Sequence, residues 1–412
     1  MPDPSSPTEG ESAPTGLPSW PEERLTLMLV GLGEVGTRLL HALASRVPDH
    51  VRIVVVSRDR GRARPKVSAA RLAASYVERY PEIDLRCLDI ADAARLVDLI
   101  GESAPSVIVN TASRSPWWAR ALLPAPIRAR LEMVGAGPGL WAPGHLALTA
   151  RLVAARDAAA PGTMLVNTAY PDVVNPALAR RSVGPIVGAG NLDLLVPAAR
   201  SVIARGLGCP TRDVRLALVA HNFHSSGILT GSPIGDLRPL MRLYVDGADR
   251  TGTVDTEILW RRIKDEAPIP QGSAAATVLV GSLVRMLRGL LSATPVRTHA
   301  PGPNGLAGGY PVRVSRTGIE IDLPPEISLE AAIDVNRAGQ RAEGIEFIRE
   351  DGALVLTETA REVLGEVFGL SRDAIPPDEA EDFSSRLLAS LDELARRYGI
   401  YLPAFDPQRQ AG

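Results

Sequence analysis

The sequence predicts an α/β protein in which a doubly wound parallel sheet is followed by a second, α+β domain. Short, continuous apolar runs begin at Leu25 and alternate with stretches whose apolar residues recur at helical spacing. This pattern is typical of a parallel sheet covered by helices on both faces. A glycine-rich turn, Gly31-Leu-Gly-Glu-Val-Gly36, separates the first run from the first helical stretch. Beyond about residue 180 the alternation ends, which predicts a second domain of different architecture.

The strands of the first domain are predicted from short, mainly apolar runs, because a strand buried on both faces needs apolar side chains on both. These runs are 25–30, 51–56, 83–88, 107–109 and 164–166. The second domain is expected to hold strands at 214–219 and 242–245, a long apolar helix at 274–291, a strand pair near 312–323 and helices toward 394.

Composition excludes several classes of protein. Lys and Arg number 45 against 47 Asp and Glu, so the net charge of −2 offers no positive field for nucleic acid or an anionic membrane. Two cysteines are too few for a disulfide framework, which favours a reducing, cytoplasmic setting. No apolar run approaches about 18 residues, so no segment is expected to span a membrane.

The glycine turn predicts a dinucleotide site of the Rossmann type. Gly31 allows the tight turn, Gly33 lets the backbone approach a pyrophosphate, and Gly36 allows the helix to pack closely on the strand. Other residues expected to contact the cofactor follow the ends of the first four strands. They are Glu34, Val35, Ser57, Arg58, Arg60, Asp89, Ile90, Thr111 and Ala112.

The end of the second strand favours NADP over NAD. An acidic residue about 20 positions after the last glycine would bind the ribose 2′-hydroxyl of NAD, but Ser57 stands there. Arg58, Arg60 and Arg62 follow, and guanidinium groups suit a 2′-phosphate. Asp59 among them leaves NAD open, and a solvated basic loop is the alternative interpretation.

The chemical site is predicted from two segments of the second half. Asn191-Leu-Asp193 precedes a predicted apolar helix, and His221-Asn-Phe-His224 lies just after the predicted strand 214–219. An imidazolium can stabilise the negative charge that develops on a carbonyl oxygen during hydride reduction and can donate the proton. A carboxylate against the other ring nitrogen would fix its tautomer. We therefore expect an Asp193–His221 dyad.

Several alternatives to this dyad remain open. In these alternative interpretations, Asp193 caps its helix, His221 is a buried core residue, or His224 takes the proton-transfer role. Two histidines at i and i+3 also suit a metal, but no third ligand stands nearby, so no metal is expected.

These segments resemble the lactate and malate dehydrogenases. In that family an Asn-Leu-Asp motif starts a helix and a histidine followed by a Ser-containing loop ends the next strand. The resemblance covers roughly residues 25–370 and implies a Rossmann domain followed by a lactate/malate-dehydrogenase-like catalytic domain. It also implies that Asn167 lies beside the substrate oxygen. Val196 stands where the family has a carboxylate-binding arginine, and residues 85–112 look more like a saccharopine-dehydrogenase-type domain, so the chain is interpreted as a divergent relative.

The segment 115–144 interrupts the regular pattern with prolines and tryptophans. In the resembled family the corresponding loop carries arginines that close over the substrate, and here Arg114 and Arg120 occupy its start. Arginine can polarise a carbonyl or bind an anion. Trp117 and Trp118 suggest a substrate larger than pyruvate.

These observations predict an oxidoreductase, preferring NADP, that acts on a carbonyl, alcohol or imine of a medium-sized metabolite. The expected limits are a disordered tail over 1–23, a dinucleotide-binding domain over 24–180 and a catalytic domain over 181–405. The expected partner is a small molecule, and the expected assembly is a homodimer or homotetramer. A non-redox enzyme that uses nicotinamide transiently and a catalytically silent dinucleotide-binding protein are the alternatives.

Overall fold

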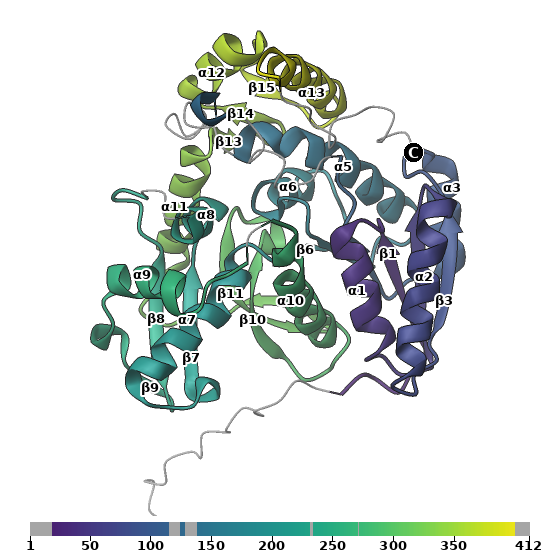
Figure 1. The fold of residues 1–412 in the computed structure, drawn as a ribbon, viewed down its shortest axis with the longest axis horizontal. Coiled ribbons are helices and arrows are strands. Elements are labelled where there is room, and N and C mark those ends of the chain that lie inside the picture. The colour runs from purple at the N-terminus through teal and green to yellow at the C-terminus, as the bar shows by residue number, and fades with distance from the viewer. Residues whose placement is uncertain (1–18, 115–123, 128–137, 231–233, 271, 400–412) are drawn as a thin grey trace, which may run out of the picture.

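A six-stranded parallel sheet forms the first domain of the computed structural model, which describes residues 19–114, 124–127, 138–230, 234–270 and 272–399. The strand order is β3-β2-β1-β4-β5-β6, and every neighbouring pair is parallel. The strands are β1 (Leu25–Val30), β2 (Val51–Ser57), β3 (Glu82–Cys87), β4 (Val107–Asn110), β5 (Met164–Asn167) and β6 (Ile186–Gly188). The predicted doubly wound sheet is confirmed (Figure 1).

The alternating side chains of the strands build two separate cores, one on each face of this sheet. Leu27 and Leu29 of β1 pack with α1 (Glu34–Ala44) and α2 (Arg60–Ser75). Met28 and Val30 face the opposite core. The helices of that second face are α3 (Ala93–Ser103), α5 (Ala142–Ala159) and α6 (Pro171–Ala179). Because successive side chains of a strand point to opposite faces, a run that is apolar throughout is what this arrangement requires.

The second domain contains two small antiparallel sheets and their helices. One sheet is β7 (Val214–Val219), β8 (Leu240–Val245) and β9 (Ala248–Asp249), and the other is β10 (Val296–Pro301), β11 (Gly309–Ser315) and β12 (Gly318–Ile321). A bridge between Ala220 and Gly309 joins the two sheets. The helices of this part are α7 (Leu192–Leu207), α8 (Asn222–Thr230), α9 (Thr256–Glu266) and α10 (Ala275–Leu290).

The C-terminal segment folds back onto the first domain. After α11 (Leu329–Ala342) it forms a three-stranded sheet, and α13 packs along α5 in the same core as β4 and β5. Its other elements are β13 (Ile345–Ile348), β14 (Leu354–Leu356), α12 (Glu358–Phe368), β15 (Ala374–Ile375) and α13 (Ala380–Arg397). Figure 1 shows this yellow-green segment beside α5.

Two of the expected domain limits differ from what the structure shows. The sixth strand of the first sheet, β6, lies beyond residue 180, so the sheet extends into the segment assigned to the catalytic domain. Residues 19–23 are also not a free tail. Trp20 packs against the core beside α10 with Arg288 above its ring, and Glu23 pairs with Arg316 at 2.7 Å. Residues 1–18 lie outside the described part.

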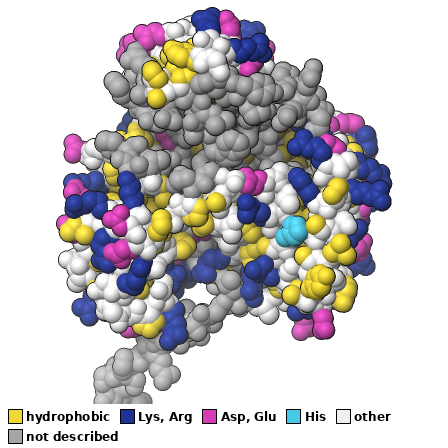
Figure 2. All heavy atoms as spheres, in the orientation of Figure 1, with side chains coloured by type: hydrophobic (Ala, Val, Ile, Leu, Met, Phe, Trp, Pro, Cys, Tyr) yellow, Lys and Arg dark blue, Asp and Glu magenta, His cyan; other side chains and the backbone are white. Residues whose placement is uncertain are grey.

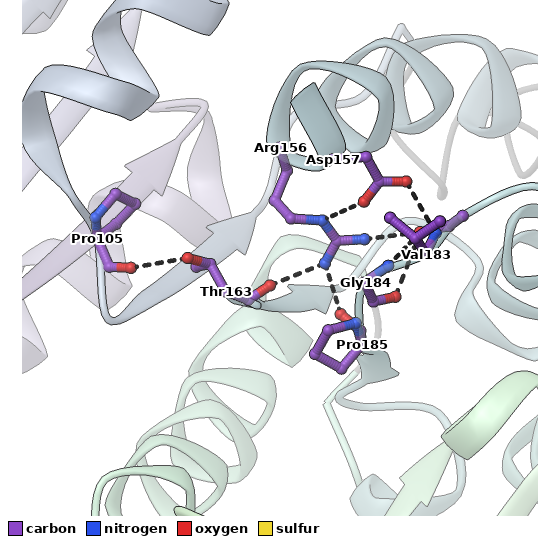
Figure 3. Close-up of polar contacts among 8 residues, drawn as sticks. Pro105, Arg156, Asp157, Thr163, Val183, Gly184 and Pro185 are labelled. Atoms are coloured by element: carbon purple, nitrogen blue, oxygen red, sulfur yellow. Dashed lines mark hydrogen bonds and ion pairs between the residues drawn. The ribbon is translucent and has the colours of Figure 1, made fainter. Parts of the chain in front are cut away.

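A fully buried arginine joins the last two strands of the sheet to the helix before them. The guanidinium of Arg156, on α5, donates to the carbonyl oxygens of Thr163 and Pro185 and to the hydroxyl of Ser182 at 2.7–2.8 Å. Asp157 accepts from its Nε at 2.6 Å and balances the charge (Figure 3). Because an unpaired buried charge is costly, this cluster holds β5 and β6 in place.

The face of the molecule drawn in Figure 2 carries charged side chains of both signs. This distribution agrees with the small net charge. Among the residues that the structure describes, no helix has the length and apolar character needed to cross a membrane.

Candidate active site

A cavity of about 670 Å³ lies over the carboxyl ends of the parallel strands. Its wall is built by both domains: one end is lined by the turns after β1, β2 and β4, and the other by the segments after β5, β6 and β7. Ligands of doubly wound sheets gather at this edge, because the strand order reverses there and helix N-termini converge.

The glycine turn forms one wall of this cavity, and its glycines differ in what surrounds them. A Cβ at Gly31 would lie 2.7 Å from the backbone nitrogen of Ala112, and one at Gly36 would lie 2.1 Å from the carbonyl oxygen of Gly31. A Cβ at Gly33 would meet nothing within 4 Å. Gly31 and Gly36 are therefore required by packing, whereas Gly33 leaves open space before α1. Gly31, Gly33, Glu34 and Val35 line the cavity.

The end of β2 supplies a basic wall. Ser57, Arg58, Arg62 and Lys66 line the cavity, and Lys66 Nζ donates to the carbonyl oxygen of Leu32 at 2.7 Å. Burial, followed by the nearby Arg62, lowers the pKa of Lys66. Asp59 caps α2 by accepting from the backbone of Arg62 at 3.0 Å. The predicted Arg60 is exposed on α2 and is not among the cavity residues.

The ends of β3 and β4 complete this half of the cavity. Asp89, Ile90, Thr111 and Ala112 line it, as expected from the sequence. The Thr111 hydroxyl donates to the carbonyl oxygen of Gly31 at 2.8 Å, which ties the end of β4 to the glycine turn.

Asn167 does not take the position that the resemblance implied. Its side chain is fully buried and not among the cavity residues. Its Oδ1 accepts from Asn110 Nδ2 at 3.1 Å and from the Ala169 backbone at 2.9 Å, while its Nδ2 donates to Asn175 Oδ1 at 2.9 Å. These bonds use its amide to shape the turn after β5, which is the physical reason that it cannot face a substrate.

That turn places Tyr170 in the cavity wall instead. Tyr170 has a left-handed backbone (φ 47°), which is uncommon for a residue other than glycine and often marks a functional turn. Its hydroxyl donates to Oε2 of Glu343, the residue after α11. Neither Tyr170 nor Glu343 was predicted from the sequence, because the pattern of each is that of an ordinary turn or helix end.

Glu343 is a buried carboxylate at which three segments meet. Besides Tyr170, its Oε1 accepts from Nδ2 of Asn222 at 2.8 Å, and its Oε2 lies 3.4 Å from Nδ1 of His221. Asn222 lines the cavity, whereas His221 is fully buried behind it. Tyr170, Glu343 and His221 thus form a line of contacts from the cavity wall to a buried imidazole, in which the hydrogen bond between Tyr170 and Glu343 can pass a proton. Nδ1 of His221 accepts from the backbone nitrogen of Phe223 at 3.3 Å.

The predicted Asp193–His221 dyad is not formed. Asp193 lies in the first turn of α7, and its carboxylate faces β10, where Nδ1 of His299 is 4.0 Å away. His221 faces Glu343 instead. The start of α7 was predicted correctly, but the spacing of the motif does not determine which side of the helix the aspartate takes.

Burial keeps both histidines of the predicted site neutral near pH 7. Desolvation, followed by the neighbouring His224, holds the pKa of His221 well below its usual range. Desolvation lowers the pKa of His224 to about 4, and its Nδ1 accepts from the backbone of His221 at 3.0 Å. Within the described ranges, no three His, Cys, Asp or Glu side chains come together as a metal site.

A second buried carboxylate, Asp172, lies in the first turn of α6. Its oxygens accept from Nδ2 of Asn191 and, at 3.0 Å, from the backbone nitrogen of Asn222. Desolvation raises its pKa to about 6, so it is ionised above that pH. Asp172 and Glu343 together hold two residues of the cavity wall, Asn191 and Asn222.

The far end of the cavity is lined by Trp141, His145 and Arg114. Arg114 donates to Glu381 at 3.0 Å and to Ser385 at 3.2 Å, both on α13. The predicted arginine therefore lies at the cavity, where it shares the carboxylate of Glu381 with Arg151. Arg120, Trp117 and Trp118 lie outside the described residues.

Comparison with known proteins places this fold. No family model matches the chain, and no curated protein matches it in sequence. Solved structures do match, with TM-scores of 0.53. Lactate dehydrogenase from Eimeria maxima with NADH and oxamate is 16% identical and covers 77% of this chain and 93% of its own. Malate dehydrogenase from Picrophilus torridus is 18% identical and covers 78% and 97%. Malate dehydrogenase from Cryptosporidium parvum is 15% identical and covers 78% and 98%.

These likenesses confirm the fold that the sequence predicted. The chain resembles the lactate and malate dehydrogenases, with a Rossmann domain followed by an α+β domain of their kind. At sequence identities of 15–18% the likeness establishes the architecture, and the chemistry depends on the residues that line the cavity.

We expect Asp172 to leave a signature in the pH dependence of stability. A carboxyl whose pKa rises from 3.8 to about 6 on folding binds more protons in the folded state between these values. The free energy of unfolding of the wild type, relative to Asp172→Asn, should therefore fall by up to about 3 kcal/mol as pH rises from about 4 to about 6, and then level off. Urea denaturation at a series of pH values measures this difference. Asp98→Asn, on the exposed face of α3, is the control, and a flat difference for Asp172→Asn would contradict the assignment.

Proposed function

We propose that the protein is a nicotinamide-dinucleotide-dependent oxidoreductase that interconverts an alcohol or amine with a carbonyl or imine in a medium-sized metabolite. The observation that carries this proposal is the continuous cavity from the glycine turn to the buried Tyr170–Glu343–His221 line. The solved structures that share the fold are dehydrogenases, and the one from Eimeria maxima contains NADH.

The residues present fit a dinucleotide. Gly33 leaves open space in front of the first turn of α1, where no side chain caps the helix, so backbone N–H groups are available to a pyrophosphate. Asp89 and Ile90 would border the adenine. When bound, the nicotinamide supplies hydride transfer, so oxidation of an alcohol removes a hydride from the carbon and a proton from the hydroxyl.

We infer a preference for NADP from the basic wall after β2. Arg58, Arg62 and Lys66 line the cavity there together with Asp59, whose Oδ1 accepts from the backbone of Arg62 as the cap of α2. Guanidinium and ammonium groups bind a phosphate by charge-assisted hydrogen bonds. The NADH of the Eimeria maxima structure is the reason to measure both cofactors in parallel.

We infer that His221 acts on the substrate indirectly. Tyr170 is the member of the line that reaches the cavity wall, so its hydroxyl would exchange the proton with the substrate oxygen. Glu343 would accept that proton, and the neutral His221 would pack behind the carboxylate at 3.4 Å without receiving the proton. This assignment replaces the Asp193–His221 pair.

The first prediction tests dinucleotide binding at the glycine turn. Gly33→Val should fold normally, because no atom lies within 4 Å of the added Cβ, but its side chain would fill the space proposed for the pyrophosphate. We expect the dissociation constants of NADPH and NADH to rise at least about tenfold, or about 1.4 kcal/mol, in fluorescence titrations. Gly162→Val, at an exposed turn with equally open space, is the matched control. Unchanged binding in a folded Gly33→Val protein would overturn the proposed cofactor site.

A second prediction tests the choice of cofactor. Arg58→Ala should weaken NADPH binding by about tenfold and leave NADH binding within about twofold, because only NADPH carries the 2′-phosphate. Arg60→Ala should change neither, since Arg60 is exposed outside the cavity. Calorimetry with both cofactors checks this. Tighter binding of NADH than NADPH by the wild type would argue for NAD.

The role of Tyr170 gives a further prediction. Tyr170→Phe should lower turnover by roughly 10²- to 10⁴-fold, the usual contribution of general acid–base catalysis, while NADPH affinity changes less than about twofold. Single-turnover kinetics over a range of pH separate this effect from binding. Tyr76→Phe, at a tyrosine that is 90% exposed, serves as the control. Turnover at the wild-type rate would exclude Tyr170 from proton transfer.

A further inference from the structure

At the end of the cavity where the substrate is proposed to bind, the wall consists of polar side chains. Buried carboxyl groups behind this wall fix the orientation of those side chains. Asn191 follows β6, and Asn222 and Ser225 follow β7, so the three come together from two strand ends. Behind them lie Asp172 and Glu343, whose side chains are almost completely buried. What these groups offer a substrate follows from their hydrogen bonds.

The amide of Asn191 is held in one orientation. Its Nδ2 donates to Oδ2 of Asp172. Its backbone is also fixed, with a positive φ of 49° at the start of α7. A flipped amide would bring its carbonyl oxygen against the carboxylate, so the amide oxygen is left as the group that a ligand can reach.

The amide of Asn222 is held in the same way by the other carboxylate. Its Nδ2 donates to Oε1 of Glu343 at 2.8 Å, and its backbone nitrogen donates to Oδ1 of Asp172 at 3.0 Å. In the described part of the chain, neither Asn222 Oδ1 nor Asn191 Oδ1 has a hydrogen-bond partner.

A serine hydroxyl, which can both accept and donate a hydrogen bond, lies beside these amide oxygens. The side chain of Ser225 is buried at the cavity, and its Oγ has no hydrogen-bond partner among the described residues. A buried polar atom without a partner costs free energy, which a bound ligand would recover. Two amide oxygens and this hydroxyl therefore all suit a ligand that donates hydrogen bonds.

The charges around this wall also favour a ligand that donates hydrogen bonds. Asp172 is ionised at pH 7.5, above its pKa of about 6, and Glu343 is a second carboxyl directly behind Asn222. A ligand carboxylate placed here would face lone pairs and negative charge, whereas a hydroxyl or an ammonium group would be stabilised. The guanidinium of Arg114 lies at the far end, where it shares Glu381 with Arg151.

We propose that this end of the cavity binds a substrate group that donates hydrogen bonds, a hydroxyl or an amine beside the reacting carbon, and that the enzyme discriminates against 2-hydroxy acids. This inference rests on the proposed function, since it names the substrate class of the same site. Val196, which stands where the resembled family has its carboxylate-binding arginine, agrees with it.

Three compounds that differ at a single carbon test the proposal. Mandelate, 1-phenylethane-1,2-diol and 2-amino-1-phenylethanol share an aromatic ring and a secondary alcohol, and carry a carboxylate, a hydroxyl or an ammonium group next to it. Binding of each to the NADP⁺-saturated protein is measured by calorimetry at pH 7.5, and formation of NADPH is followed in parallel. We expect the diol or the amino alcohol to bind at least about tenfold more tightly than mandelate, and comparison of these two identifies which donor is preferred.

The Ser225→Ala variant tests whether this part of the cavity wall causes the preference for a hydrogen-bond donor. Because Oγ has no partner to lose, the variant should fold as the wild type does, and it should weaken binding of the preferred donor by about 3- to 10-fold, the effect of one hydrogen bond. Its affinity for mandelate should not change. Ser68→Ala, exposed on α2, is the matched control and should leave both affinities unchanged.

The possible failures are distinguishable. Preferential binding of mandelate, or no binding of either donor to a protein that binds NADPH, would overturn the substrate class and leave the proposed function standing. An effect of Ser225→Ala equal to that of Ser68→Ala would also overturn it. Failure of the wild type to bind NADPH or NADH would overturn the proposed function, and with it this inference.

Discussion

The buried carboxylate of Glu343 is the constraint on which the arrangement of the site depends. A charge removed from water is tolerated only when hydrogen bonds replace its hydration. Here Tyr170 donates from the end of the first domain, and Asn222 donates from the second. Because the carboxylate itself belongs to the C-terminal segment, satisfying it requires all three parts of the chain to meet at one point. Displacing Tyr170 or Asn222 would remove one of the donors to this carboxyl group.

The same requirement explains why the C-terminal segment packs on the first domain. Glu343 follows α11 directly, and the chain then forms β13 to β15 and runs back along α5 as α13. Arg114 and Arg151 both pair with Glu381 of α13 and hold that helix beside the strand ends. The apolar contact between α13 and α5 supplies buried surface area, and the ion pairs of Glu381 determine where α13 lies along α5. The segment is thus a part of the site wall as well as of the core.

The sequence predicts the features that depend on neighbouring residues and misses those that depend on distant ones. Runs such as 25–30 and the glycine turn are local patterns, so the parallel sheet and the open space at Gly33 could be expected. Glu343 is 173 residues from Tyr170 and 121 from Asn222, and nothing at its own position distinguishes it from an exposed helix end. The prediction of an Asp193–His221 pair was wrong for a related reason. The motif indicates that both residues lie near strand and helix ends, but the packing of α7 on β10 decides that Asp193 faces His299.

Opposite electrostatic character at the two ends of the cavity gives it a direction. Arg58, Arg62 and Lys66 lie with Asp59 at the end after β2, while the carboxyl groups of Asp172 and Glu343 lie behind the wall after β6 and β7. In the proposed function, the basic groups at the first end would stabilise a phosphate, and the carboxyl groups at the second would favour a donor group of the substrate. The proposed dinucleotide and substrate would therefore share the cavity in one preferred orientation. The direction is imposed by charges on separate parts of the chain, so substitutions at one end should affect the ligand of that end alone.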